Sequence, residues 1–210
     1  MGERNYNTEQ EKFWVGDFAS TYRENNCYFD EASGVDAWNI MLSSPKNINS
    51  VLECGSNIGR NIGFLNSVLP NAKKSIIEIN SEAFQVITNK YDIEHAYNGS
   101  IINSAFDENK FDLVFTMGVL IHIHPDSLLE NMNKIFNYSG KYVLIGEYFN
   151  RTPVMLEYHG QSERLFKRDF GRMFIENFSV RIIDYGFLWG WFYDDAGFGD
   201  ITWWLFEKDI

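Results

Sequence analysis

Residues 51–62 constrain the fold of this chain more than any other stretch, because they join a buried strand, a glycine turn and the start of a helix. Val51 and Leu52 begin a hydrophobic run, and apolar residues recur at helical spacing from Ile58 to Leu69. Gly55 lets the backbone turn tightly and lets a ligand approach without a Cβ in the way. A helix start offers unpaired N–H groups to polar or anionic atoms. We therefore expect a ligand cradle here.

The spacing of the glycines distinguishes between ligands. A dinucleotide fingerprint reads Gly-x-Gly-x-x-Gly, and a phosphate loop reads Gly-x-x-x-x-Gly-Lys followed by Ser or Thr. This chain has neither pattern; from Glu53 to Gly59 it has an acidic residue, one spacer, a glycine, three spacers and a second glycine. A second acidic residue, Glu78, ends an apolar segment about 20 residues after Gly59. A carboxylate at that position can accept hydrogen bonds from both hydroxyls of a ribose.

Length and composition favour one domain over residues 1–210. The 210 residues, 45% of them hydrophobic, can bury a sizeable core. No apolar run is long enough to span a membrane, and the first residues lack the layout of a signal peptide, so we expect a cytoplasmic protein. A net charge of −11 disfavours nucleic acid and acidic membrane surfaces as partners, because both need a basic field. A small-molecule partner is expected instead, bound by a monomer or a homodimer.

Strand and helix patterns alternate from residue 50 onward. We expect strands at 50–54, 74–79, 93–97, 111–116 and 141–147, and helices at 57–69, 81–91 and 125–136. The last of these helices should begin at Pro125 and bury Leu128, Leu129, Met132, Ile135 and Phe136. Two more strands, 179–185 and 201–208, close the chain. This alternation predicts an α/β fold with a mostly parallel sheet, helices on both faces, and ligands at the carboxyl ends of the strands.

Residues 1–45 precede the first strand, and we expect them to form a helical lid. Thr8 and Glu11 match a capping box, and Ser33 or Asp36 is suited to cap a second helix. Both segments carry tryptophans, Trp14 and Trp38. Plain packing of these two rings is the alternative to a role in covering a ligand.

The acidic-Gly-x-x-x-Gly turn followed by the acidic end of the next strand resembles the cofactor site of class I S-adenosylmethionine-dependent methyltransferases. The resemblance implies a Rossmann-like seven-stranded sheet whose last strand is antiparallel. It also implies S-adenosylmethionine as cofactor, S-adenosylhomocysteine as product, and no metal. The residues it places around the cofactor lie at four strand ends: Glu53, Gly55, Ser56, Asn57 and Gly59; Glu78, Ile79 and Asn80; Gly99, Ser100 and Ile101; and Thr116, Met117, Gly118 and Val119. An ordinary Asn-Gly turn is the alternative for the third group.

Methyl transfer is an in-line displacement, so the protein must align the acceptor and, for a hydroxyl, help to remove its proton. A histidine that titrates near neutrality suits that task, and His122 is our candidate base. Tyr148 and His159 are further catalytic candidates. A lone histidine is more often structural, and His124 before Pro125 is placed to cap a helix.

Residues 148–175 are expected to form an insertion on the substrate side. In an otherwise acidic chain this segment concentrates cations, and paired hydrogen bonds from arginine suit a carboxylate or phosphate. The candidate acceptor contacts are Tyr22, Glu147, Arg151, Tyr158, Arg164 and Arg168. The alternative is a solvated helix in which Glu163 and Lys167 form an i, i+4 pair.

Over nearly its whole length the chain looks like the methyltransferases associated with pseudaminic acid biosynthesis in bacteria. Five stretches carry this resemblance: Phe13 to Asn26, Val51 to Gly59, Gly118 to Ile123, Glu147 to Tyr158, and Thr202 to Lys208. It implies an anionic, sialic-acid-like or nucleotide-linked sugar as acceptor, methylated at oxygen. Two alternatives stay open: N-methylation of an amino sugar or small amine, and a non-catalytic module that retains the cofactor or its product.

Overall fold

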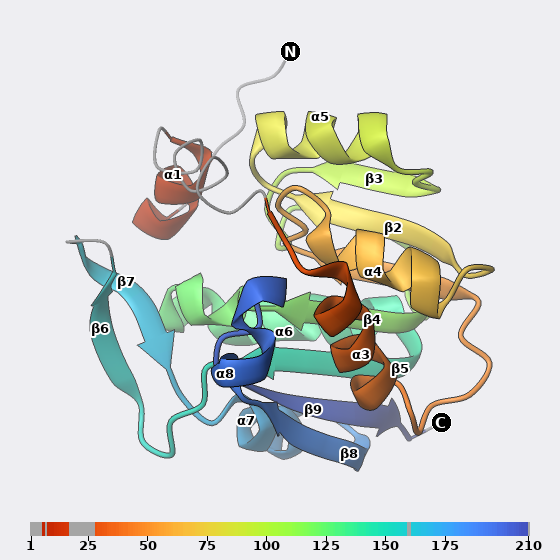
Figure 1. Ribbon diagram of the computed structural model, residues 1–210. Coiled ribbons are helices and arrows are strands. Elements are labelled where there is room, and N and C mark those ends of the chain that lie inside the picture. The colour runs from red at the N-terminus through yellow and green to blue at the C-terminus, as the bar shows by residue number, and fades with distance from the viewer. Residues whose placement is uncertain (1–5, 7, 17–27, 159–160, 210) are drawn as a thin grey trace.

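A computed structural model describes residues 6, 8–16, 28–158 and 161–209 (Figure 1). Its main sheet has seven strands in the order β3-β2-β1-β4-β5-β9-β8. The pairs among β1 to β5 are parallel, and β9 runs antiparallel to both of its neighbours. The strands are β1 (Ser50–Cys54), β2 (Lys73–Glu78), β3 (His95–Asn98), β4 (Phe111–Met117), β5 (Ser139–Glu147), β8 (Val180–Leu188) and β9 (Ile201–Lys208). The predicted α/β fold with an antiparallel last strand is confirmed.

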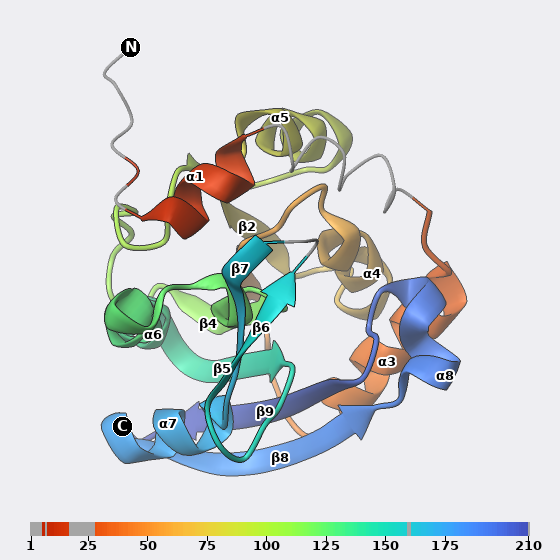
Figure 2. The ribbon, with the colours of Figure 1, turned by 90° about the vertical axis from the view of Figure 1, so that its left-hand side faces the viewer.

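Helices cover both faces of this sheet. Figure 2 shows α6 and α7 on one face and α3 and α4 on the other, with α5 beside the β2 and β3 end. The helical segments are α1 (Glu9–Val15), α3 (Glu31–Met41), α4 (Arg60–Val68), α5 (Ser81–Lys90), η1 (Leu120–His122), α6 (Pro125–Tyr138), α7 (Phe170–Asn177), α8 (Gly190–Tyr193) and η2 (Asp194–Ala196). No helix among the described residues combines the length and the apolar character that crossing a membrane requires.

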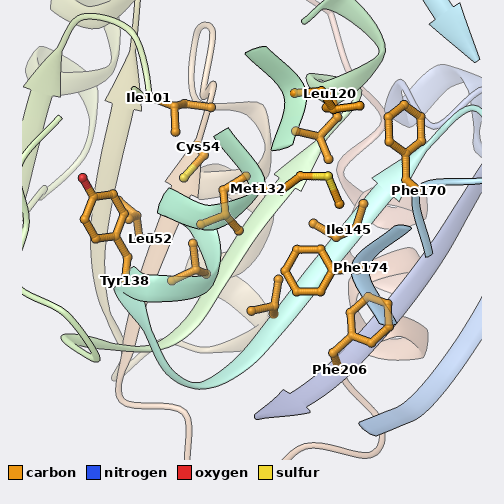
Figure 3. Packing of buried hydrophobic residues seen from close by; sticks show 14 of the residues in the cluster. Leu52, Cys54, Ile101, Leu120, Met132, Tyr138, Ile145, Phe170, Phe174 and Phe206 are labelled. Carbon is orange, nitrogen blue, oxygen red and sulfur yellow. The ribbon is translucent and has the colours of Figure 1, made fainter. Parts of the chain in front are cut away.

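Two clusters of buried side chains hold these layers together. On the α6 and α7 face, Leu52, Met132, Ile145, Phe174 and Phe206 belong to one continuous cluster (Figure 3). On the opposite face a second cluster is built from α3, α4 and the other sides of the same strands. Because the central strands are buried on both faces, they read as continuous apolar runs, which is why the sequence shows them clearly.

Two elements at the carboxyl edge of the sheet come from distant parts of the chain. A separate antiparallel hairpin, β6 (Val154–Tyr158) and β7 (Gln161–Lys167), projects beside that edge. The helix α1 lies beyond the same edge (Figures 1 and 2). The central strand ends therefore lie between a segment from the N-terminus and one that follows β5.

Several local expectations were wrong. The side chain that caps α3 is Asp30, whose carboxylate accepts the N–H of Ser33 at 3.0 Å, so neither Ser33 nor Asp36 is the cap. Leu129 is 47% exposed, because it falls on the outer side of α6. The segment around Glu163 and Lys167 is a strand, which removes the i, i+4 alternative. The last two predicted strands, by contrast, are present as the antiparallel pair β8 and β9, which are joined through α8 and η2.

The helices α3 and α4 approach closely at Gly34, and we expect the stability of the protein to depend on this glycine. A Cβ at Gly34 would lie 2.3 Å from Cζ of Phe64, which is itself buried. We expect Gly34→Ala to lower the free energy of unfolding, because overpacking costs about 1–3 kcal/mol and outweighs the gain in helix propensity of about 1 kcal/mol. The urea midpoint measures this. Asn39→Ala, at an exposed position of the same helix, is the control. A midpoint for Gly34→Ala at or above that of wild type would contradict the packing.

Candidate functional site

A pocket of about 450 Å³ lies at the carboxyl ends of β1, β2, β3 and β4. It brings together nearly all of the residues predicted to surround a cofactor. Those that line it are Glu53, Gly55, Ser56, Asn57, Glu78, Ile79, Asn80, Gly99, Ser100, Ile101, Met117, Gly118 and Val119. Gly59 and Thr116 are absent from the lining, and each has another task.

The turn after β1 is built on left-handed backbone. Gly55, Asn57 and Gly59 have φ angles of 84°, 47° and 79°. A Cβ at Gly55 would lie 2.6 Å from Cγ2 of Val119, so this glycine allows the turn to contact the loop that follows β4. Gly59 caps α4, and a Cβ there would meet the ring of Tyr91 at 2.9 Å. Gly59 therefore serves helix packing and does not line the pocket.

Glu78 links the first two strand ends. Its carboxylate accepts the backbone N–H of Asn57 at 2.6 Å and that of Asn80 at 2.7 Å, one on each oxygen. The side chain is only 5% exposed and lines the pocket. The two backbone N–H groups therefore fix the carboxylate at the wall of the pocket. The strand end thus presents a fixed acceptor pair.

Glu53 places a second buried carboxyl in the same pocket. Its Oε1 accepts a hydrogen bond from Nδ2 of Asn61 at 2.7 Å, whereas Oε2 has no hydrogen-bond partner among the described residues. Burial raises the pKa of Glu53 to about 8, against the lowering effects of the Asn61 hydrogen bond and the nearby charge of Arg60. A cationic ligand group beside Oε2 would satisfy this oxygen.

The far end of the pocket is lined by residues that the sequence did not reveal. Ser127, Glu130 and Asn131 line it from α6, and Ser100 and Ile101 line it from the segment after β3. Oγ of Ser100 is buried and has no hydrogen-bond partner in the part of the chain that the structure describes. The signal available in the sequence was the i, i+3, i+4 spacing of these three polar residues on an otherwise amphipathic helix.

The helix α1 closes one side of the pocket. The predicted capping box is present: Oγ1 of Thr8 accepts the N–H of Glu11, and the Glu11 carboxylate accepts the N–H of Thr8, both at 3.1 Å. At the other end of α1, Nδ2 of Asn80 donates to the carbonyl of Trp14 at 3.2 Å. Four residues of this segment line the pocket: Thr8, Gln10, Glu11 and Trp14.

The two histidines of the loop after β4 differ in role. His122 ends η1, lines the pocket and lies 4.8 Å from the Trp14 ring, centroid to centroid. His124 also lines the pocket, and it caps α6, because its Nδ1 accepts the N–H of Asp126 at 3.3 Å. The alternative of a structural histidine therefore applies to His124. The role of His122 as a base stays a prediction.

The predicted acceptor contacts divide into three groups. Glu147 is fully buried and bonded to the loop after β4, so it does not reach an acceptor. Arg151 is exposed, and Arg168 is half-buried, with a pKa lowered by desolvation. Tyr22 and His159 lie outside the described residues, as do the side chains of Tyr158 and Arg164.

Tyr148 lines a second, more open groove of about 890 Å³. The Lys167 ammonium lies 4.9 Å from the centre of its ring. The other walls are largely aromatic: Phe149, Phe187, Trp189 and Trp191, with Asp194 and Asp200 among them. The last pair between β4 and β5 is Met117 with Gly146. Tyr148 therefore follows the end of β5 beside the loop that begins at Gly118. The groove and the pocket have no lining residue in common among those that the structure describes.

Comparison with protein-family models and with curated proteins finds no match. Solved structures with the same fold do match. One is the 1,6-didemethyltoxoflavin-N1-methyltransferase from Burkholderia thailandensis, bound to 1,6-didemethyltoxoflavin and S-adenosylhomocysteine. It is 15% identical to this chain with a TM-score of 0.69, and the match covers 100% of this chain and 94% of the methyltransferase. A S-adenosylmethionine-dependent methyltransferase from Leishmania major is 14% identical with a TM-score of 0.73, over 95% and 82%.

A third structure, magnesium protoporphyrin IX methyltransferase from Synechocystis with bound S-adenosylmethionine, is 12% identical with a TM-score of 0.65, over 98% of this chain and 100% of its own. At such identities the comparisons establish the fold alone, which is the Rossmann-like fold of class I methyltransferases. They do not single out the family associated with pseudaminic acid.

The buried carboxyl groups of Glu53 and Glu147 should make the stability of the protein depend on pH. Burial raises the pKa of Glu53 to about 8 and that of Glu147 to about 7. A carboxyl whose pKa is higher in the folded than in the unfolded state stabilises the fold below its unfolded pKa, and that contribution is lost as pH rises through the folded pKa. We expect the free energy of unfolding to fall between pH 5 and about 8.

Glu53→Gln removes the charge and keeps an oxygen for Asn61. The free energy of unfolding of this variant, measured by urea denaturation, should therefore increase relative to that of wild type as pH rises over this range. Glu108→Gln, which removes an exposed carboxylate before β4, is the control. A constant difference between Glu53→Gln and wild type from pH 5 to 8 would show that Glu53 does not titrate there.

Proposed function

We propose that this chain is an S-adenosylmethionine-dependent methyltransferase that acts on a small polar acceptor at oxygen. One observation carries the proposal. In a class I methyltransferase fold, Glu78 holds a carboxylate at the end of β2, facing the pocket and fixed by the N–H groups of Asn57 and Asn80. That position and orientation suit the two hydroxyls of a ribose.

The remaining lining suits the other parts of the cofactor. Oε2 of Glu53, which has no partner among the described residues, is available to the ammonium group of a methionine moiety. Oγ of Ser100 is available to the adenine edge, and Ile101 is placed to pack on its face. When bound, S-adenosylmethionine supplies an electrophilic methyl group on a sulfonium. The buried carboxyls and the acidic chain favour a cationic ligand of this kind.

The protein's own contribution to the reaction is alignment and proton removal. Met117, Gly118 and Val119 line the pocket, and Met117 pairs with Gly146, two residues before Tyr148, so an acceptor beside Tyr148 would lie near the cofactor site. His122 lies on the loop after β4 and can take the proton of an acceptor hydroxyl. The contact with Trp14 holds its ring from the lid side.

The groove beside Tyr148 supports an anionic sugar as acceptor. Lys167 supplies a cation at its wall, and the indole rings of Trp189 and Trp191 offer flat apolar surface for the ring of a sugar. A sialic-acid-like sugar or its nucleotide-linked form combines these features. The carboxylates of Asp194 and Asp200 in the same groove favour a second candidate, N-methylation of an amino sugar.

The cofactor part of this proposal is tested by calorimetric titration with S-adenosylhomocysteine. We expect wild type to bind, and Glu78→Ala to bind at least about 10-fold more weakly, because hydrogen bonds to a charged acceptor are lost. Glu82→Ala, which removes an exposed carboxylate nearby on α5, should bind like wild type. No binding by folded wild type would overturn the proposal.

The acceptor part is tested with methyl-labelled S-adenosylmethionine and a panel of carboxylated and amino sugars, free and nucleotide-linked. We expect transfer by wild type and a loss of about 100-fold in Tyr148→Ala, because alignment of the acceptor is lost, with unchanged S-adenosylhomocysteine affinity. Tyr185→Ala, at an exposed position of β8 outside the groove, is the control. Transfer by Tyr148→Ala at the wild-type rate would refute this acceptor site. Cofactor binding without transfer to any sugar would refute a sugar acceptor and favour a binding module.

A further inference from the structure

We propose that Glu147 is a positioning residue that fixes the loop between β4 and α6 against the cofactor pocket. Its carboxylate, at the end of β5, accepts hydrogen bonds from a run of N–H groups on that loop. This inference rests on the proposed function, because it concerns the binding of the same cofactor.

The hydrogen bonds of Glu147 converge on one short segment. Oε1 accepts from the backbone N–H of Val119 at 3.0 Å and of Leu120 at 2.9 Å, and from Oγ1 of Thr116 at 3.2 Å. Oε2 accepts the N–H of Ile121 at 3.3 Å. The first N–H groups of a helix have no partner inside it. One carboxylate therefore satisfies three consecutive N–H groups where η1 begins.

The segment that Glu147 holds is part of the pocket. Gly118, Val119 and His122 all line it. The N–H of Gly118 donates to the carbonyl of Gly146 at 2.8 Å, and the N–H of His122 to the carbonyl of Val119 at 2.9 Å. Movement of η1 would therefore move the candidate base and the side chain of Val119, which packs beside the turn at Gly55.

The chemistry of the residue supports this role over simple packing. Glu147 is 0% exposed, and burial of a carboxyl group is costly unless its oxygens are hydrogen-bonded. Glutamine at this position would offer one oxygen and, with that oxygen in the place of Oε1, would turn its NH₂ group towards the N–H of Ile121. Only a carboxylate presents acceptors on both oxygens to the whole run.

The test compares Glu147→Gln with a matched control at the opposite edge of the sheet. Asp112 also accepts two backbone N–H groups, of Asn49 at 2.7 Å and Ser50 at 3.1 Å, but lies far from the pocket. Both Glu147→Gln and Asp112→Asn should lower stability. Only Glu147→Gln should weaken S-adenosylhomocysteine binding, by about 10-fold, measured by calorimetry on folded protein. It should also shift the amide resonances of residues 119–121 in ¹H–¹⁵N spectra without ligand.

The outcomes separate this inference from the proposed function. Failure of wild type to bind S-adenosylhomocysteine would overturn both. Binding by wild type and equal binding by folded Glu147→Gln would overturn the positioning role alone, as would unchanged amide resonances. If Glu147→Gln does not fold, Glu147→Asp is the second variant to test. It keeps the carboxylate and shortens the side chain by one methylene group. Its affinity should also fall, and wild-type affinity in this variant would count against the inference.

Discussion

Two buried carboxylates satisfy backbone N–H groups at the carboxyl edge of the sheet, and the geometry of the pocket depends on them. Glu78 joins the turn after β1 to the residue that caps α5, and Glu147 joins the end of β5 to the start of η1. Loops at strand ends have N–H groups that no strand or helix satisfies. By holding them with charged side chains, the chain fixes three loops whose residues line one pocket.

Carboxyl groups also line the pocket itself. Glu53 at the end of β1 and Glu78 at the end of the neighbouring β2 belong to its wall, whereas Glu147 at the end of β5 does not. Such a site suits a cationic ligand such as a sulfonium with its ammonium group. An anionic acceptor would be repelled from it, and the structure offers Lys167 in the neighbouring groove.

The pocket is completed by elements that lie far apart in the sequence. The helix α1 contributes Gln10 and Trp14, and α6 contributes Ser127 and Asn131. The hydrogen bond from Asn80 to the carbonyl of Trp14 connects α1 to the strand end that carries Glu78. Both α1 and the carboxylate of Glu78 are thus hydrogen-bonded to the short segment that follows β2.

The sequence by itself determined the order of strands and helices from β1 to β5, the turn at Gly55 and the acidic end of β2, because buried strands and glycine turns leave local patterns. It misplaced what depends on contacts between distant segments. Glu147 was expected to meet an acceptor, the cap of α3 was assigned to Ser33 or Asp36, and α6 was not expected to line the pocket. Only the tertiary structure decided these points, since a carboxylate or a polar helix face has the same local pattern whether it meets solvent, a ligand or a backbone N–H group that the fold brings beside it.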